Sequence, residues 1–429
     1  MAEEVEMSYS YVQLSSKHKP VHFDPVSANV NVFFDDANNQ VFVVRSNGSG
    51  GIIVFEDNGS SHTYRIEDRG EISAVRLSPS RTILAVQRAP NALDFINFGE
   101  GKEGTPYCQT CKGKTTQISD FFWASDSEII FVTDLGVEFY EVNADKKAVK
   151  CTKTISVGLV NWSLWHYDSK NLLISSGVYG NIIHPFHYNN GTLFKYAKFE
   201  IELAFYPTDP KLTLLRRDVI ITNMYNQMYV VASKQDARST QSAEIVLYKL
   251  FKDKPTAKSN ILKLNTSGQF QVNIVDNLIL VHHLQSKTTF LYDLKFASVS
   301  DQQVDIHQLP LVSPLPMKRS TYKHPFVPSF GVSQTPSVKT ELYSSHWIAF
   351  QPDIIIDAIQ GCMWKTEINL AAFPLMITDR YLWLYCLYSV NGAVSILIIL
   401  GGWSKKFLSL KPNAVFNRKF TPIYHNVKG

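Results

Sequence analysis

The chain has 429 residues, of which 45% are hydrophobic and 12% aromatic, so it is long and apolar enough to bury a large core. Charged residues make up 19%, which argues against a mostly disordered chain. The formal net charge is +4, the acidic and basic residues are interspersed, and no run of five basic residues occurs, which argues against nucleic-acid binding.

Residues 1–19 are predicted to form a flexible N-terminus. Their start is polar and acidic, without the basic and apolar regions of a signal peptide. The whole chain has five cysteines, an odd and sparse set that does not suggest a disulfide framework. These features favour a reducing compartment.

Four segments share one pattern, in which an apolar strand, a short polar turn and a second apolar strand follow one another. The segments are 32–44, 74–86, 120–132 and 164–175. Their turns use Asp, Asn, Ser and Pro, which are typical turn residues. The second strands begin near Val41, Ile83, Ile129 and Leu172, at spacings of 42, 46 and 43 residues. This is the period of a four-stranded propeller blade.

Further strands follow this repeat. Third strands are predicted at 52–55, 93–98, 137–142 and 182–188, and later strands at 227–233, 244–250, 277–283, 288–294, 345–350, 353–359 and 361–368. The pattern predicts an all-β protein, a β-propeller of about seven blades over residues 20–370. A strand near Val21–Phe23 is expected to complete the last blade, because closure removes exposed edges. A pair of stacked β-sheets is the alternative.

The predicted core lies on the first and second strands of the blades. The residues expected to be buried are Phe34, Leu84, Ile130, Leu173 and Leu278. Residues 297–341 break the strand pattern because they are rich in Pro and Ser. Proline removes donors from a β-ladder, so this segment is predicted to be a loop or extended insertion.

The segment 108–115, Cys-Gln-Thr-Cys-Lys-Gly-Lys-Thr, is close to a phosphate-binding loop. That loop needs a glycine at the position of Cys108 and a helix after it, whereas a strand is predicted there. Nucleotide binding through Lys114 is therefore not expected.

Two other groups of residues could suggest a metal. Cys108 and Cys111 form one C-x-x-C pair, but zinc needs two more ligands. His184 and His187 could supply them only if loops met across two blades, so a solvated hairpin loop is favoured. The neighbours His282 and His283 lie on a predicted strand and point to opposite faces, so they do not chelate one ion easily.

No sequence pattern outlines an active site. The chain has no Gly-x-Ser-x-Gly and no His-Glu-x-x-His motif. Asp35 and Asp36 are interpreted as solvated turn residues. A propeller hydrolase or lectin would need acids or a metal site at the central channel, and none is found. The prediction is that the chain is not an enzyme and has no catalytic residue, no cofactor and no metal site.

Eight stretches resemble a known family in the same order. They are 25–46, 83–88, 127–142, 184–188, 198–203, 242–250, 273–283 and 342–356, and include PVSANVNVFFDDANNQVFVVRS and LYSSHWIAFQPDIII. Over residues 20–370 the chain resembles the regulators of the Mon–Ccz complex, also called the Bulli or Mic-one-like family.

This resemblance implies a non-catalytic accessory subunit of the Mon–Ccz guanine-nucleotide exchange complex. The implied partners are the Mon and Ccz subunits and, indirectly, the late-endosomal Rab GTPase on which that complex acts. The implied role is to support endosome-to-lysosome maturation and autophagy. The implied location is the cytosolic face of late endosomes and lysosomes, with membrane contact through the complex.

Residues 371–429 form a divergent tail. The family continues into a long helical domain, which this tail does not resemble. Residues 381–403 carry no charge and are long enough to span a membrane. The basic residues beyond them would place the propeller in the lumen, against the implied partners. Two options stay open: a segment collapsed on the propeller, and a helical span that makes the chain a membrane-tethered adaptor unrelated to that complex.

Overall fold

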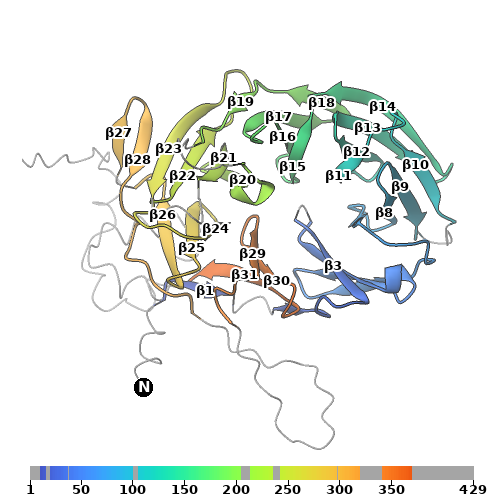
Figure 1. The fold of residues 1–429 in the computed structure, drawn as a ribbon, viewed down its shortest axis with the longest axis horizontal. Coiled ribbons are helices and arrows are strands. Elements are labelled where there is room, and N and C mark those ends of the chain that lie inside the picture. The colour runs from blue at the N-terminus through green and yellow to red at the C-terminus, as the bar shows by residue number, and fades with distance from the viewer. Residues whose placement is uncertain are drawn as a thin grey trace, which may run out of the picture.

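Short strands rich in Val, Ile and Phe, separated by tight polar turns, form seven β-sheets arranged in a ring (Figure 1). The computed structural model describes residues 10–15, 20–36, 38–99, 105–203, 213–234, 242–296, 298–318 and 341–369. Each sheet is built around a meander of three or four consecutive antiparallel strands, and the first strand of the meander faces the centre of the ring. The predicted β-propeller of about seven blades is therefore confirmed.

Blades 1 to 4 each contain four consecutive antiparallel strands. Blade 1 has β3 (Val30–Asp35), β4 (Gln40–Arg45), β5 (Ile52–Glu56) and β6 (Ser61–Tyr64). Blade 2 has β7 (Ala74–Leu77), β8 (Ile83–Ala89), β9 (Ala92–Asn97) and β10 (Tyr107–Thr110). Blade 3 has β11 (Ile118–Ser125), β12 (Glu128–Thr133), β13 (Gly136–Asn143) and β14 (Ala148–Ser156). Blade 4 has β15 (Val160–His166), β16 (Asn171–Ser176), β17 (Ile182–Asn189) and β18 (Thr192–Lys195), with β19 (Phe199–Glu200) also on β17.

Blades 5 to 7 are less regular. Blade 5 has β20 (Val219–Met224), β21 (Gln227–Lys234), β22 (Glu244–Lys249) and β23 (Ala257–Lys263). Blade 6 has three strands, β24 (Phe270–Val275), β25 (Leu278–His283) and β26 (Thr288–Asp293). Blade 7 has β29 (Trp347–Phe350), β30 (Ile354–Asp357) and β31 (Cys362–Ile368), completed by β1 (Val12–Leu14) and β2 (Val21–His22).

The core consists of seven hydrophobic clusters, one between each pair of neighbouring blades. Leu84, Ile130, Leu173 and Leu278 lie on second strands and are each 0% exposed, as predicted. Phe34 was expected to be buried and is only half-buried. The reason is that β3 is the inner edge of its sheet, so no further strand covers its channel side. Phe34 packs instead against Phe350, with 4.2 Å between the ring centroids.

Both ends of the described chain close the ring in blade 7. The expected strand near Val21–Phe23 is present, because β2 pairs with β31. A second strand, β1, also pairs with β31, so the prediction of a flexible N-terminus over residues 1–19 is wrong for Val12–Leu14. Short runs such as Val12–Leu14 carry too little periodicity to stand out, but their apolar side chains complete the cluster between blades 6 and 7.

The start of the Pro/Ser-rich segment is part of the sheets rather than a plain loop. Its hairpin of β27 (Val299–Asp301) and β28 (Val304–His307) joins blade 5, because β28 pairs in parallel with β23. The next residues run along the outer edge of blade 6, where the N–H of Leu311 donates to the carbonyl of Leu291 at 2.7 Å. This segment occupies the edge where blade 6 lacks a fourth strand.

The tail 371–429, including the apolar segment 381–403, lies outside the described residues. Among the residues that are described, no helix has the length and hydropathy needed to cross a membrane.

Two deletions test the role of the chain ends. Deleting residues 1–15 removes Tyr11, Val12 and Leu14, which are at most 2% exposed, and should lower the free energy of unfolding by about 4 kcal/mol or more. Deleting residues 371–429 removes no described strand, so the melting temperature should not fall. Thermal unfolding of the two truncated proteins beside the full chain measures both. An unchanged melting temperature after the first deletion, or a lower one after the second, would contradict this account.

Candidate functional site on the channel and faces of the propeller

The phosphate-loop-like segment belongs to blade 2 and the link that follows it. Cys108 is exposed on β10, and residues 111–117 lead directly into strand β11 rather than into a helix. Burial, then Glu138, raises the pKa of the Cys111 thiol to about 12. Burial, then Asp94, raises the pKa of Cys108 to about 11. Both thiols therefore remain protonated at neutral pH.

The residues considered for a metal do not converge. His184 and His187 lie on β17 of blade 4, two blades from Cys108 and Cys111, and His184 Nε2 is 2.8 Å from Ser176 Oγ. Across the described ranges, His, Cys, Asp and Glu form no group of three or more that could hold an ion.

His282 and His283 point to opposite sides of β25, as predicted. His283 Nδ1 is 2.7 Å from Ser286 Oγ. His282 is completely buried, with Nδ1 2.9 Å from Thr289 Oγ1 and Nε2 3.1 Å from Asn273 Oδ1. Asn273 donates in turn to the carbonyl of Ile354 in blade 7 at 3.1 Å. This chain of buried hydrogen bonds ties blade 6 to blade 7, and burial lowers the pKa of His282 to about 3.

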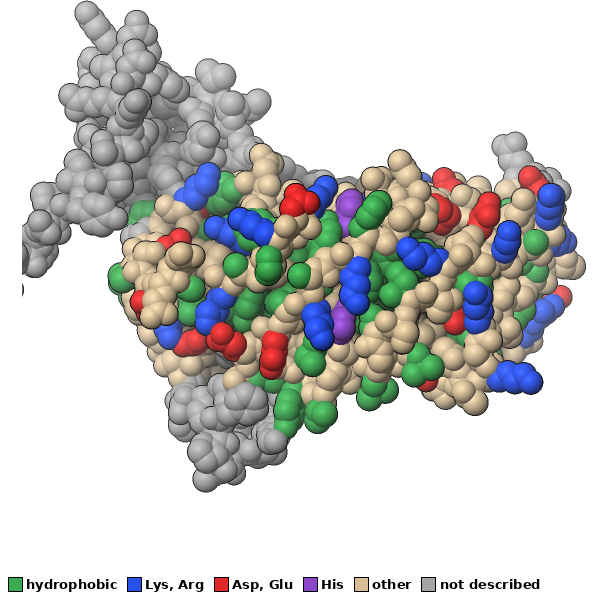
Figure 2. All heavy atoms as spheres, turned by 90° about the horizontal axis from the view of Figure 1, so that it is seen from above, with side chains coloured by type: hydrophobic (Ala, Val, Ile, Leu, Met, Phe, Trp, Pro, Cys, Tyr) green, Lys and Arg blue, Asp and Glu red, His purple; other side chains and the backbone are tan. Residues whose placement is uncertain are grey.

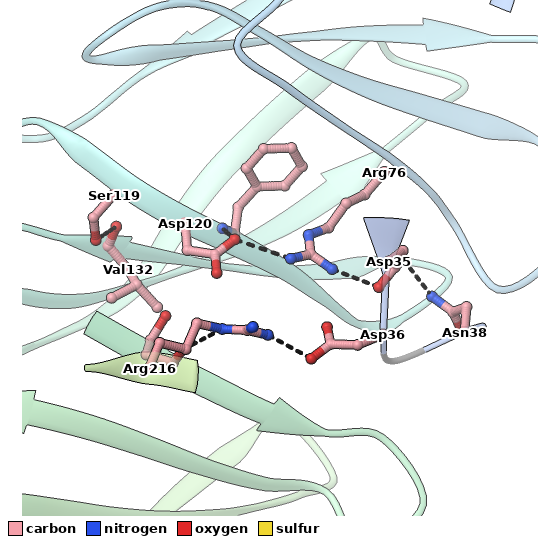
Figure 3. A network of polar contacts seen from close by, with 10 residues as sticks. Asp35, Asp36, Asn38, Arg76, Ser119, Asp120, Val132 and Arg216 are labelled. Carbon is pink, nitrogen blue, oxygen red and sulfur yellow. Dashed lines mark hydrogen bonds and ion pairs between the residues drawn. The ribbon is translucent and has the colours of Figure 1, made fainter. Parts of the chain in front are cut away.

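A group of paired charges lies on the first strands of blades 1, 2 and 3 (Figure 3). Arg76 of β7 donates to Asp35 of blade 1 at 2.5 Å and to Asp120 of blade 3 at 3.0 Å. Its guanidinium carbon also lies 4.6 Å from the centre of the Phe122 ring. Burial lowers the pKa of Arg76, but Asp35 and Asp120 raise it more, so the guanidinium stays charged. Arg76 thus links three consecutive blades.

A second ion pair crosses the channel. Asp36 follows β3 in the first turn of blade 1 and pairs with Arg216, which precedes β20 of blade 5 (Figure 3). Arg216 Nε also donates to the carbonyl of Ser163 in blade 4 at 3.2 Å. Blades 1 and 5 are not neighbours in the ring, so this contact holds opposite sides of the channel together.

The interpretation of Asp35 and Asp36 as solvated turn residues is wrong. Their side chains are only 1% and 6% exposed, and each pairs with an arginine. A turn sequence alone cannot show which distant side chain lies opposite it, and Arg76 and Arg216 carry no distinctive motif. The network sets three carboxylates against two guanidinium groups, so one negative charge remains, and its ion pairs suit a rigid connection between blades.

The two faces of the ring carry different loops. One face carries the links that join consecutive blades, together with the turn that joins the second strand of a blade to its third strand. We call it the connecting face. The other face carries the turn that joins the first strand to the second and the turn that joins the third strand to the fourth, and we call it the hairpin face. The outer wall shown in Figure 2 mixes basic, acidic and hydrophobic side chains.

Exposed hydrophobic side chains are distributed unevenly between these faces. Ten large ones are exposed among the described residues, and none of the ten lies in a turn of the hairpin face. Six lie on the connecting face: Val26, Leu135, Leu159, Val178, Leu215 and Ile359. Apolar side chains held in solvent on one face of a protein are typical of an interaction surface. The connecting face is therefore the candidate functional site.

The hairpin face offers a hollow between the turns of blades 3 and 4, with a volume of about 620 Å³. Its charged side chains already have partners. Glu128 accepts a hydrogen bond from Tyr188, and Lys170 donates to the carbonyl of Ala124 at 3.2 Å. Lys170 also lies over the Tyr167 ring, 3.3 Å from its centre. This hollow is the weaker candidate because its polar groups satisfy one another.

Two sequence comparisons with known proteins point to one family. Residues 32–149 match the sequence model described as "Regulator of MON1-CCZ1 complex, N-terminal". A mouse protein named "Regulator of MON1-CCZ1 complex" is 39% identical over 297 residues, which are 68% of this chain and 44% of the mouse protein. The human protein of that name is 38% identical over the same shares. A Dictyostelium discoideum homolog is 27% identical over 45% of this chain and 18% of its own length. The chain thus spans less than half of these relatives.

Replacing Arg76 tests the channel network. In Arg76→Met the buried carboxylate of Asp35 loses its counter-charge, which should lower the free energy of unfolding by about 3–5 kcal/mol. Arg216→Met is the matched control, because Arg216 is more exposed and its loss should cost less. Urea unfolding of both variants measures the difference. Equal, small losses would show that the network does not hold the blades together.

His282 should make stability depend on pH. Its folded-state pKa of about 3 lies below the ordinary 6.5, so the unfolded chain binds the extra proton between these values. The free energy of unfolding should therefore be fully maintained above pH 6.5 and should fall, through this group, by about 1.4 kcal/mol per pH unit as the pH drops toward 3. Urea unfolding at pH 7, 6, 5 and 4 should give a shallower slope for His282→Gln than for the parent. Identical slopes would contradict this role.

Proposed function

The chain belongs to the family of regulators of the MON1-CCZ1 complex, and we propose that it acts as a non-catalytic accessory subunit of that complex. The observation that carries the proposal is the 39% identity over 297 residues with the mouse regulator. The chain spans 44% of that relative, so the partners of the whole protein are part of the proposal.

The roles of the polar clusters support a non-catalytic function. The ion pairs at the channel connect blades 1, 2, 3 and 5. His282 is enclosed between blades 6 and 7, and the thiols of Cys108 and Cys111 have raised pKa values. A general base or nucleophile needs an accessible group with a pKa near the working pH. These groups instead suit a rigid body that presents its loops to other proteins.

We also propose where the chain acts in the cell. We place the chain with the MON1 and CCZ1 subunits on the cytosolic face of late endosomes and lysosomes. There it would support nucleotide exchange on the late-endosomal Rab GTPase, and through it endosome-to-lysosome maturation and autophagy. Contact with the membrane would come through the complex, or directly through residues 381–403.

Co-purification tests the proposal. The full chain is expressed with MON1 and CCZ1, and the complex is isolated through a tag on MON1. The chain should be retained in constant proportion to the other two, and by itself it should not release nucleotide from the Rab GTPase.

Two outcomes would overturn the proposal: loss of the chain from an intact MON1–CCZ1 pair, or nucleotide release by the chain alone. The chain without residues 371–429 is co-purified in the same way, as the matched control for a contribution of the tail. If the full chain instead pellets with membranes without MON1 and CCZ1, and the deleted chain does not, the tethered adaptor replaces this proposal.

A further inference from the structure

Four apolar side chains form a surface on the connecting face of blades 3, 4 and 5. We call it the blade 3–5 patch: Leu135, Leu159, Val178 and Leu215, which are 52%, 67%, 87% and 43% exposed. Two come from turns between second and third strands and two from links between blades. The loops that carry them belong to three consecutive blades, so the four side chains lie on one continuous stretch of the ring.

Hydrogen bonds between the loops hold the patch together. The N–H of Val157 donates to the carbonyl of Leu135 at 3.2 Å, which fixes the link that carries Leu159. Asn161 Nδ2 donates to the carbonyl of Gly177 at 2.6 Å. The N–H of Leu214 donates to the carbonyl of Tyr179 at 2.8 Å, which joins the last two loops. The apolar side chains are therefore presented by ordered loops.

Val178 is the most exposed of the four and sits in a constrained turn. Gly177 and Gly180 flank Val178 and Tyr179 with φ of 86° and 66°. A Cβ at position 180 would lie 2.7 Å from the carbonyl oxygen of Leu214, so the loop can pack this closely only with glycine there. The turn thus holds an apolar side chain in water, with 87% of it exposed. A partner that covers Val178 would gain the burial energy at little cost in ordering.

The charges around the patch select the partner. Lys112, Lys114 and Arg217 are exposed and make no ion pair with a described residue. Two carboxylates lie beside the patch: Asp134 accepts from the N–H of Gln117 at 3.0 Å, and Asp218 from the N–H of Leu215 at 2.9 Å. The three basic side chains outnumber these two carboxylates, so the net charge of the five residues is positive.

We propose that the blade 3–5 patch docks an acidic protein segment that carries apolar side chains. The inference rests on the proposed function, because it assigns this segment to the MON1–CCZ1 complex. Its apolar side chains would cover Val178 and Leu159, and its carboxylates would pair with Arg217 and the Lys112–Lys114 loop. Covering exposed apolar side chains removes apolar surface from water and so contributes binding energy, and the surrounding charges set specificity and rate.

A lipid bilayer fits this surface less well. Leu135 and Leu215 are only half-exposed. Leu135 directly follows Asp134, and the N–H of Leu215 donates to Asp218 three residues later. Inserting these leucines into the acyl region would carry the carboxylates with them, which costs free energy. A protein segment can cover the leucines and leave the aspartates in water.

Binding of the purified MON1–CCZ1 pair to immobilised full chain tests the proposal. The double variant Leu159→Asp/Val178→Asp should weaken binding at least about tenfold. Phe194→Asp is the matched control, because Phe194 is 50% exposed on the outer strand β18 and its change should leave affinity within about twofold. Both substitutions lie at exposed positions, and equal melting temperatures verify that the variants fold.

The charge requirement is tested with Lys112→Glu/Arg217→Glu. This variant should also bind at least about tenfold more weakly, and the parent should lose affinity as salt rises from 50 to about 500 mM. If charge reversal and salt have no effect, the acidic chemistry assigned to the segment is wrong.

The remaining outcomes distinguish the docking site, the accessory function and membrane binding. If the parent binds and the Leu159/Val178 variant binds equally well, the docking site is overturned while the accessory function stands. If the parent does not bind MON1–CCZ1 at all, the proposed function fails and this inference with it. The parent and the Leu159/Val178 variant are also floated with phosphatidylserine-containing vesicles. If the vesicles capture the parent but not this variant, the surface binds membrane and the protein-docking proposal is overturned.

Discussion

Burial of both faces of every blade is the constraint on which the rest of the structure depends. Each sheet is apolar on two sides, and the seven hydrophobic clusters lie one at each junction of neighbouring blades. The junctions on either side of blade 7 need residues from both ends of the described chain, because β1 and β2 pair with β31. Ring closure therefore protects two clusters and removes the open edge that β31 would otherwise present.

Polar contacts add cross-links that the apolar clusters cannot provide. The clusters join only neighbours, whereas the Asp36–Arg216 pair joins blades 1 and 5 across the channel. On the other side of the ring, His282 and Asn273 connect blades 6 and 7 through buried hydrogen bonds. A buried polar group lowers the stability of the fold unless it is fully paired. Such networks therefore favour the one arrangement of the blades in which every partner is in place over arrangements in which the blades are shifted relative to one another. The result is a rigid frame for the loops.

Function then depends on the loops that the rigid frame displays. The hairpin turns expose no large hydrophobic side chain among the described residues, whereas the connecting face exposes six. The same loops that link the blades thus carry the surface most suited to a protein partner. This division agrees with the proposed accessory role, in which the core would supply shape and one face recognition.

The sequence by itself determined the architecture, because strand periodicity and turn residues are local properties that repeat every 42 to 46 residues. It also identified the family from ordered matching stretches. Tertiary structure alone decided the burial of Asp35 and Asp36, the strand at Val12–Leu14, and the grouping of Leu135, Leu159, Val178 and Leu215 on one surface. Each of these depends on residues far apart in the chain, and a side chain's partner across a ring leaves no trace in its local sequence.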